Sequence, residues 1–386
     1  MRSETFDAVV IGARCAGASV AMLMAKQGMS VLCVDRDEAG TDTLSSHAMT
    51  RGAVMQLERW GVAQRLMAHD TPWIGRSTFH FGDEVIPVDL RPMNGVPGMM
   101  GTRRHITDRV LAEAAAEAGA ELRYRCAFRD VLREGSGRVT GVILSDPLGR
   151  TYDVSAGLVV GADGLRSTVA RRLGAPVTRQ GINALTHIYA YVRGMPLADN
   201  HAFFAKGLSV GVLPTNGGQS CVIASVRPES FRGLRATMTE TEALRHLASE
   251  TNAELGVMMN DAEIVGVPKV FGGHVGRMHQ AAGPGWALVG DAGYFRDPVT
   301  AHGMTDAFRD AEVLARAAAS GTDQALSDFA AARDAVTKDI WTLTDRLAAF
   351  DMPVTEVRDL FLWLSAAMRD EQAWMQDRFS LKAIAA

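Results

Sequence analysis

The N-terminal part of the chain alternates between apolar runs and a helical pattern. Residues 6–11 lead into a continuous apolar run and residues 30–35 contain a second one, as is typical of strands buried in a parallel sheet. Between them, over 16–28, apolar residues recur at helical spacing, and this pattern stops at Gly28. A strand, a helix and a second strand within about 30 residues predict a βαβ unit, the first piece of a doubly wound sheet.

Further helices and strands follow this unit. Helical spacing predicts helices over 50–60 and 107–118, and each pattern ends just before a glycine. Segments 138–145 and 150–154 flank a turn and predict a hairpin, and 157–161 predicts another buried strand.

The second half of the chain changes character twice. From 180 to 275 the pattern becomes short strands separated by turn signals, which predicts a mainly antiparallel sheet. Residues 286–290 return to a buried strand, and the chain from 302 onward is predicted to be mostly helical. The whole pattern predicts an α/β fold with a Rossmann-like doubly wound sheet, an inserted antiparallel sheet and a helical C-terminus.

Composition narrows the class of protein. The 386 residues are 47% hydrophobic and 22% charged, as in ordinary globular proteins. The net charge of −4, with both signs interspersed, argues against nucleic acid or an anionic membrane as the main partner. The four cysteines lack CxxC spacing, so we expect neither a disulfide framework nor a metal site. The start of the chain has no basic leader, and no apolar run reaches about 18 residues, so we expect a cytoplasmic protein without a membrane span.

A glycine turn joins the first strand to its helix. In the segment Gly12-Ala-Arg-Cys-Ala-Gly17, Gly12 permits a tight turn and Gly17 permits close packing of helix on strand. The start of the helix offers free N–H groups to a pyrophosphate, and Asp35 at the end of the second strand can hold a ribose. Arg14 stands where the dinucleotide fingerprint normally has glycine. The alternative is a plain turn in which Asp35 is a solvated strand end.

Two later turns also follow buried strands. The segment Gly161-Ala-Asp-Gly-Leu-Arg-Ser167 runs into a predicted helix that Ser167 can cap, and alone it is explained as a structural turn. The segment Gly290-Asp-Ala-Gly293, followed by Asp297-Pro-Val-Thr-Ala-His-Gly-Met304, places Asp291 at the carboxyl end of a strand. Ligands bind at such ends in open α/β sheets.

The three turns, in this order, resemble those of the flavoprotein monooxygenases of the para-hydroxybenzoate hydroxylase fold. The geranylgeranyl reductases and flavin halogenases are related families. The resemblance extends over the whole chain in outline and implies bound FAD. It also implies that the chain divides into six segments: FAD-binding parts at 1–75, 101–179 and 276–320, substrate-domain strands at 76–100, a substrate-binding sheet at 180–275, and C-terminal helices at 321–386.

The resemblance implies cofactor contacts at matching positions. On the adenosine half, the contacts would be to the pyrophosphate (Gly12, Ala13, Arg14, Ala16, Gly17), the ribose (Asp35) and the adenine (Arg36). Arg104 would reach the middle of the cofactor, and Asp163 belongs to the second motif, which is linked to both FAD and the nicotinamide nucleotide. On the flavin half, the contacts would be to the ribityl or pyrophosphate region (Gly290, Asp291), the reactive edge of the flavin (Pro298) and its pyrimidine side (Gly303, Met304). The family often has Gly-Gln-Gly where this chain has Ala301-His302-Gly303. We expect FAD binding to survive that change.

The implied reaction is a monooxygenation. NADPH or NADH would reduce FAD, and O2 would then form a flavin C4a-hydroperoxide that oxygenates a small aromatic or apolar molecule. Candidate substrate contacts lie in the middle sheet: His187, Tyr189, Tyr191 and Phe203. Because residues two apart share a face of a strand, the first three should point the same way. Candidate catalytic residues are His47 and His302, as proton donors, and Pro298.

Several alternatives remain. The same motifs would suit an FAD-dependent reductase of an alkene or isoprenoid, and a non-redox isomerase, cyclase or binding module could also hold FAD. A halogenase is disfavoured because the Trp-x-Trp-x-Ile-Pro segment is missing. A second glycine-rich fingerprint is also missing, so the nicotinamide nucleotide would bind transiently at the FAD domain, or a partner flavin reductase would supply reduced flavin. We expect a monomer or a homodimer.

Overall fold

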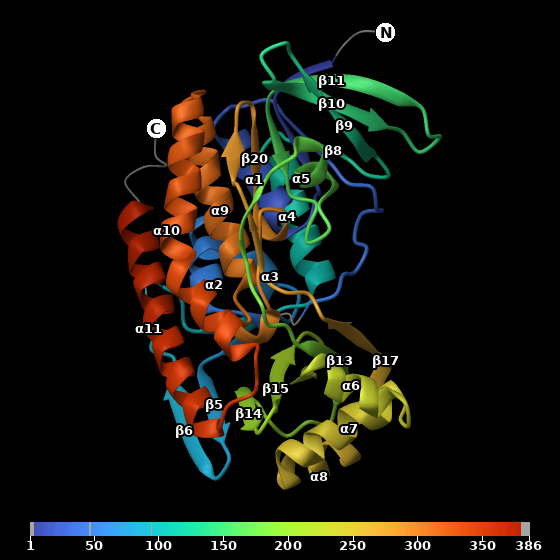
Figure 1. Cartoon of the computed structure of the whole chain (residues 1–386), viewed down its shortest axis with the longest axis vertical. Coiled ribbons are helices and arrows are strands. Elements are labelled where there is room, and N and C mark those ends of the chain that lie inside the picture. The colour runs from blue at the N-terminus through green and yellow to red at the C-terminus, as the bar shows by residue number, and fades with distance from the viewer. Residues whose placement is uncertain (1–3, 46–47, 94, 380–386) are drawn as a thin grey trace.

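Two large sheets and a layer of long helices make up the molecule. The computed structural model describes residues 4–45, 48–93 and 95–379. An eight-stranded sheet lies in the upper part of the view and a seven-stranded sheet in the lower part, and long helices run along the left side (Figure 1). Two three-stranded sheets lie between these elements.

The eight-stranded sheet has a parallel centre. Its main order is β19-β20-β11-β1-β2-β8. The bounds are β1 Glu4–Ile11, β2 Val31–Val34, β8 Glu121–Arg123, β9 Ala127–Arg133, β10 Val139–Ser145, β11 Thr151–Gly161, β19 Ala282–Gly283 and β20 Trp286–Leu288. β1 pairs in parallel with β2 and β11, and helix α1 (Cys15–Lys26) joins β1 to β2. The predicted βαβ unit and the α/β fold are therefore confirmed.

One strand is longer than the sequence pattern indicated. We expected separate strands at 150–154 and 157–161, but both belong to β11, so this expectation is wrong. The first half of β11 pairs antiparallel with β10, and the rest pairs in parallel with β1. The predicted hairpin exists, and its second strand continues into the central sheet.

The seven-stranded sheet is mainly antiparallel, as predicted. Its order is β17-β13-β16-β15-β14-β5-β6, and only β14 and β5 pair in parallel. The bounds are β5 Arg76–Phe81, β6 Glu84–Asp89, β13 Thr186–Arg193, β14 Asn200–Ala205, β15 Leu208–Thr215, β16 Gln219–Val226 and β17 Glu263–Gly272.

Three helices interrupt the stretch in which we expected only strands. They are α6 (Pro228–Arg235), α7 (Glu240–Thr251) and α8 (Ala253–Asp261). Thr239 and Glu242 form a capping box at the start of α7, and its apolar residues pack on one face of the sheet. This local helix signal prevails over the turn signals around it, so the strand prediction is wrong here.

Seven further helices are described. They are α2 (Arg51–Arg59), α3 (Ala63–Met67), α4 (Arg104–Glu117), α5 (Thr168–Leu173), α9 (Gly303–Ala318), α10 (Asp323–Leu347) and α11 (Val354–Arg378). The small sheets comprise β3 (Ala48–Met49), β4 (Trp73–Ile74) and β7 (Met99–Gly101), and β12 (Val177–Gln180), β18 (Arg277–His279) and β21 (Tyr294–Phe295). Helix α4 begins three residues before its predicted start at 107, which brings Arg104 into its first turn.

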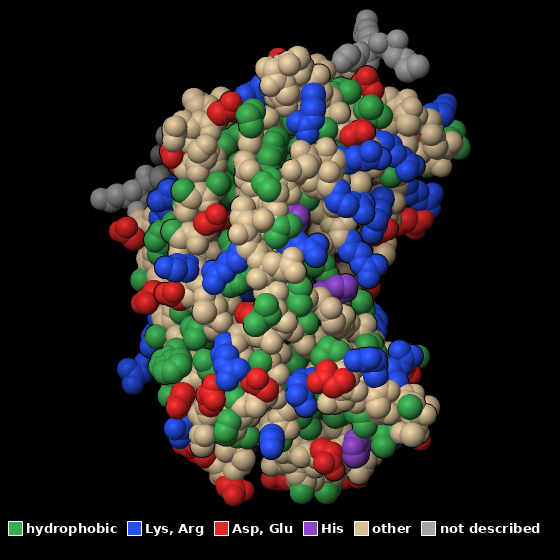
Figure 2. All heavy atoms as spheres, in the orientation of Figure 1, with side chains coloured by type: hydrophobic (Ala, Val, Ile, Leu, Met, Phe, Trp, Pro, Cys, Tyr) green, Lys and Arg blue, Asp and Glu red, His purple; other side chains and the backbone are tan. Residues whose placement is uncertain are grey.

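Charge is unevenly distributed over the face seen in Figure 2. Lys and Arg side chains gather along the right-hand side of the upper half, whereas both signs mix in the lower half. Among the described residues, none of the helices combines the length and apolarity needed to cross a bilayer.

Candidate active site

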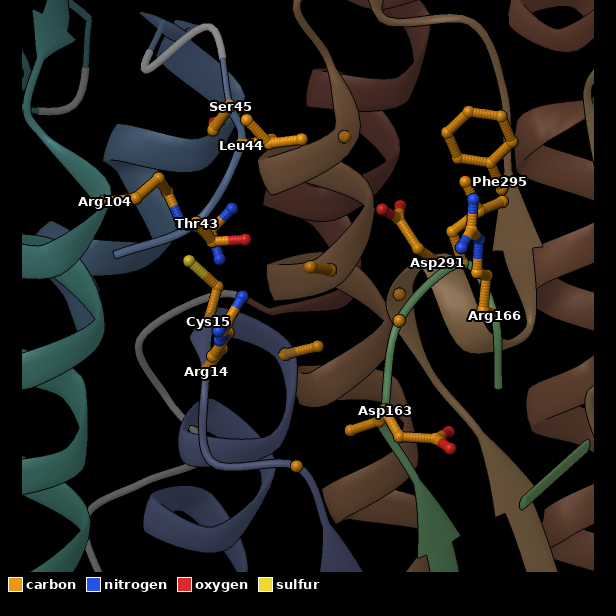
Figure 3. Close-up of a pocket in the computed structure, with 18 of the residues that line it drawn as sticks. Arg14, Cys15, Thr43, Leu44, Ser45, Arg104, Asp163, Arg166, Asp291 and Phe295 are labelled. Carbon is orange, nitrogen blue, oxygen red and sulfur yellow. The ribbon is translucent and has the colours of Figure 1, made fainter. Parts of the chain in front are cut away.

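The three sequence motifs line one cavity of about 870 Å³. Gly12 and Arg14 come from the first turn, Asp163 from the second, and Asp291 from the third. Figure 3 shows Arg14, Cys15 and Arg104 on one side, Asp291, Arg166 and Phe295 on the other, and Asp163 below. Turns that lie far apart in the sequence therefore converge on a single space.

Glycines allow the three turns to pack against one another. Gly12 has φ +105°, and a Cβ there would lie 2.4 Å from the carbonyl oxygen of Ala162 in the second turn. A Cβ on Gly17 would lie 1.7 Å from the Gly12 carbonyl oxygen of its own turn and 3.1 Å from the Cβ of Ala162 in the second turn. One on Gly290 would lie 2.9 Å from the Cβ of Ala16. Any side chain at these positions would separate the turns and deform the cavity.

The N-terminus of α1 presents backbone amides to the cavity. The N–H groups of Ala16 and Gly17 have no hydrogen-bond partner among the described residues, and Ala16 lines the cavity. Such a helix end attracts an anion because of its unpaired donors and the helix dipole. The side chain of Arg14 forms an ion pair with Asp37 at 2.9 Å, which directs it toward the end of β2.

Asp35 supports the same turn. Its carboxylate accepts hydrogen bonds from the amides of Ala13 at 2.8 Å and Asp37 at 2.9 Å. Each oxygen keeps a further lone pair, so a ribose hydroxyl can still donate to it. Arg36 lines the cavity with a side chain that is 79% exposed.

A buried carboxylate fixes Arg104. Asp108 accepts from the Arg104 guanidinium at 3.1 Å and from the Cys15 amide at 2.9 Å. It thereby ties α4 to the start of α1 and orients Arg104, which lines the cavity. Sequence reasoning missed this role of Asp108, although its spacing of four residues from Arg104 on a helix was a usable signal.

Asp291 faces the cavity, and its side chain is exposed to the space inside it, although protein surrounds that space. Burial raises the pKa of its carboxyl to about 6, and the nearby guanidinium of Arg104 partly opposes that rise.

Asp163 stabilises the second turn. It accepts from the Ser167 hydroxyl at 2.5 Å and from the Thr168 amide at 2.6 Å, while Ser167 caps α5.

The start of α9 forms another wall. Gly303 and Met304 line the cavity, and their amides have no partner in the described part of the chain. His302 precedes them, but its side chain is fully buried, and its Nε2 lies 2.5 Å from a carboxylate oxygen of Glu371. The ring therefore points into the interior, which argues against direct proton donation by His302 to a substrate.

A second buried histidine that is bonded to a carboxylate lies at the other end of this loop. His187 Nε2 is 3.2 Å from Asp297, and its Nδ1 is 2.8 Å from the Ser225 hydroxyl. Asp297 also accepts from the amides of Leu185 at 2.8 Å and Val299 at 3.0 Å. Both pairs link residues that are remote in sequence, so no spacing signal could reveal them.

The four candidate substrate contacts do not all reach the cavity. His187 and Tyr189 line it, whereas the Tyr191 ring lies under the Arg103 guanidinium at 3.8 Å. Phe203 stacks on His80 at 4.0 Å and packs into the core beneath α7. This position argues against substrate contact by Phe203. Candidate His47 lies outside the described residues.

The comparisons with known proteins agree with this architecture. A family model described as FAD binding domain matches residues 5–342. This chain belongs to that family of FAD-binding flavoprotein oxidoreductases. The resemblance to the para-hydroxybenzoate hydroxylase fold and its relatives is therefore confirmed.

The similar proteins are named for different activities. A digeranylgeranylglycerophospholipid reductase from Methanosarcina mazei is 28% identical over 339 residues, which cover 82% of this chain and 75% of that protein. The p-nitrophenol 4-monooxygenase of Pseudomonas putida has a similar structure, with a TM-score of 0.77 and 18% identity over 97% of this chain and 98% of that one. The myxobacterial chondrochloren halogenase has a TM-score of 0.80 and 21% identity over 91% of this chain and 83% of that one. Proteins named as a reductase, a monooxygenase and a halogenase are thus all similar to this chain.

The volume and the lining of the cavity fit FAD, independently of the similarity to known proteins. Its volume lies within the range of about 300–1,000 Å³ typical of ligand sites. The glycine turns leave room where a Cβ would intrude, and unpaired amides stand at the starts of α1 and α9. Arg104 and Asp291 line the same cavity from opposite sides in Figure 3. The individual contacts to FAD stay predictions.

Proposed function

We propose that this chain is an FAD-dependent monooxygenase that oxygenates a small aromatic or otherwise apolar molecule. The observation that carries the proposal is the apolar share of the cavity lining, which also includes Pro298. The apolar lining comprises Leu44, Tyr189, Ile223, Val270, Phe271 and Phe295, with Leu44 and Phe295 on opposite sides in Figure 3. A flat apolar molecule would fit between such surfaces, and they would exclude water from the reacting centre.

When bound, reduced FAD supplies the activation of O2 that an oxygenation requires. The residues of this chain orient the substrate. Burial raises the pKa of Tyr189, so its hydroxyl stays protonated and can donate a hydrogen bond to a substrate oxygen. Both ring nitrogens of His187 are already bonded within the protein, so this side chain lines the cavity without a free nitrogen for the substrate.

Positive charge near the cavity supports a nicotinamide nucleotide as the reductant. Arg166 is exposed and lines the cavity together with His274. Burial lowers the pKa of His274, and Arg166 and Arg277 lower it further, so the two arginines carry the charge. Lys and Arg side chains also gather on the upper right of the face seen in Figure 2. Anionic NADPH or NADH would be attracted to such a surface.

Reduction of an isoprenoid double bond is the second candidate, because the Methanosarcina relative is named for such a reaction. The size of the cavity argues against it. About 870 Å³ has to hold both FAD and the substrate, which leaves little room for a long chain. A compact substrate suits the remaining space better.

Oxygen consumption tests the proposal. We expect a purified yellow protein whose NADPH or NADH oxidation and O2 uptake are stimulated by a small phenolic or apolar substrate, with one atom of 18O2 in the product. Anaerobic turnover that saturates an alkene would establish the reductase, and turnover without any reductant would establish a non-redox activity. A colourless protein that takes up no FAD would overturn the cofactor assignment itself.

A substitution at one residue of the cavity lining makes the test specific. We expect Tyr189→Phe to retain FAD and to lower kcat/KM for a hydroxylated substrate by about tenfold, the value of one hydrogen bond. Tyr152→Phe is the control, because Tyr152 lies on β11 and outside the residues that line the cavity. Equal kcat/KM in the two variants would remove Tyr189 from the substrate site.

A further inference from the structure

The cavity loop Pro298–His302 rests on a buried network of charged side chains. His302 and Glu371 are fully buried, and His302 Nε2 lies 2.5 Å from one carboxylate oxygen of Glu371. Arg309 donates to the other oxygen. Glu371 belongs to α11, so the last described helix of the chain reaches the loop that precedes α9.

The network continues along α9. Arg309 also pairs with Asp306 at 2.8 Å and with Asp310 at 2.7 Å. Arg296 pairs with the other oxygen of Asp306 at 2.5 Å. All of these side chains are at least nine-tenths buried, so water does not screen their charges.

Charge balance favours one more cation. Burial raises the pKa of the Asp310 carboxyl, and the Arg309 guanidinium opposes that rise and favours the ionised form. Arg296 and Arg309 carry two positive charges, whereas Asp306, Asp310 and Glu371 carry three negative ones when ionised. An unbalanced buried charge is costly, and an imidazolium at His302 removes the imbalance.

The surrounding groups leave this balance unchanged. Arg333 approaches Asp310 from α10 but forms its own pair with Asp334 at 2.6 Å. Burial raises the pKa of the Tyr294 hydroxyl, so it stays neutral. Asp291, whose pKa burial raises to about 6, faces the cavity and Arg104.

The position of His302 matters because it is the N-cap residue of α9. The amides that follow it face the cavity, and Ala301 before it has φ +51°, a conformation that a side chain disfavours. A cation at His302 would add to the positive end of the helix dipole. Positive charge next to the flavin ring stabilises its reduced, anionic form.

We propose that Glu371 is a positioning residue that holds His302 as a cation behind the flavin loop and so favours reduction of the bound flavin. The inference rests on the proposed placement of the flavin at the start of α9. His302, Asp306 and Glu371 also lie close enough together to surround a metal ion. The guanidinium of Arg309 already bonds to both carboxylates, which favours an ion-pair network.

The test compares Glu371→Gln with the wild-type protein in the FAD-bound form. We expect the variant to bind reduced FAD about tenfold more weakly relative to oxidised FAD, which lowers its reduction potential. Glu371→Asp, which keeps the charge, should restore most of the potential.

Two controls separate this effect from a general loss of stability. Glu356→Gln lies on the same helix, where Glu356 pairs with Arg346 at the surface, and it should leave the potential unchanged. His302→Asn removes the cation itself and should lower the potential even where Glu371→Gln does not fold. A lower melting temperature with an unchanged potential in both variants would overturn the proposal.

The protonation of His302 can also be read without flavin. In the FAD-free protein, 15N NMR of labelled histidine should report an imidazolium at His302 in the wild type and a neutral ring in Glu371→Gln. A neutral His302 in the wild type contradicts the inference. A protein with this imidazolium that nevertheless binds no FAD would contradict the proposed function and leave the network intact.

Discussion

The protein surroundings change the pKa values of individual side chains at the cavity. Asp291 is the clearest case, because burial raises the pKa of its carboxyl from 3.8 to about 6. The folded FAD-free protein therefore binds more protons than the unfolded chain between about pH 4 and pH 6. Stability falls as the pH rises through this window and stays lower above it.

Asp291→Asn should remove this pH dependence. We expect the FAD-free variant to be about 1 kcal/mol more stable than the wild type at pH 7 and nearly equal to it at pH 4, because solvent in the cavity screens part of the shift. Urea unfolding at the two pH values measures the difference. Asp83→Asn, in the exposed turn between β5 and β6, is the control and should show no such dependence. A variant less stable than the wild type at pH 7 would contradict the prediction.

The local sequence revealed some of these residues and not others. Gly12 and Gly17 were predictable because a turn between a strand and a helix constrains the backbone within a few residues. The pairs His187–Asp297 and His302–Glu371 join residues that are 110 and 69 positions apart. Spacing along the chain carries no information on such contacts. Sequence reasoning therefore placed the histidines at the site but gave His302 a direct catalytic role that its buried ring argues against.

At the scale of elements, the loop between β21 and α9 is clamped at both ends. His302 and Glu371 fasten one end to α11, and Asp297 fastens the other end to β13 through Leu185 and His187. A loop held in this way can keep the conformation of Ala301 without a glycine.

Asp297→Asn should loosen one end of this loop. The amide cannot accept from all three donors that bond to Asp297, so a buried donor loses its partner, and we expect a loss of about 2 kcal/mol in the free energy of unfolding. The absorption spectrum of bound FAD should change as well. Asp345→Asn is the matched control, because Asp345 accepts from the amides of Ile182 and Asn183. It should cost stability without a change in the spectrum, and the same spectrum in both variants would disprove the clamp.

The order of elements was largely predictable, and the errors have physical causes. The strands of the βαβ unit and the helices after 302 have long periodic patterns, which is where sequence signals are strongest. The merged strand β11 depends on two different partners, β10 and β1, and this pairing is invisible in a single segment. The helices over 228–261 follow from caps and local apolar spacing, which turn residues nearby had obscured.

At the scale of the whole molecule, α11 ties the two large sheets together. Its N-terminal half approaches β5 and β14, whereas its C-terminal half carries Glu371 to α9, and Figure 1 shows this red helix along the left side. Phe361 contacts three aromatic rings of the lower sheet. Its ring centroid lies 4.8 Å from that of Phe204, 6.1 Å from Phe79 and 6.4 Å from Phe81. We therefore expect both sheets to unfold in a single transition.

Phe361→Ala tests this coupling. The loss of a half-buried ring from an aromatic cluster should lower the free energy of unfolding by about 2–3 kcal/mol, less than the loss expected for a fully buried phenylalanine. Trp363→Ala is the control, because Trp363 is 60% exposed on the same helix and should change stability by no more than about 0.5 kcal/mol. Both substitutions raise helix propensity, so this contribution largely cancels in the comparison. Circular dichroism and intrinsic fluorescence should give the same urea midpoint for each variant, because α11 transmits the loss from the lower sheet to the FAD-binding part. Two separate transitions, or equal effects of the two substitutions, would show that α11 does not couple the two sheets.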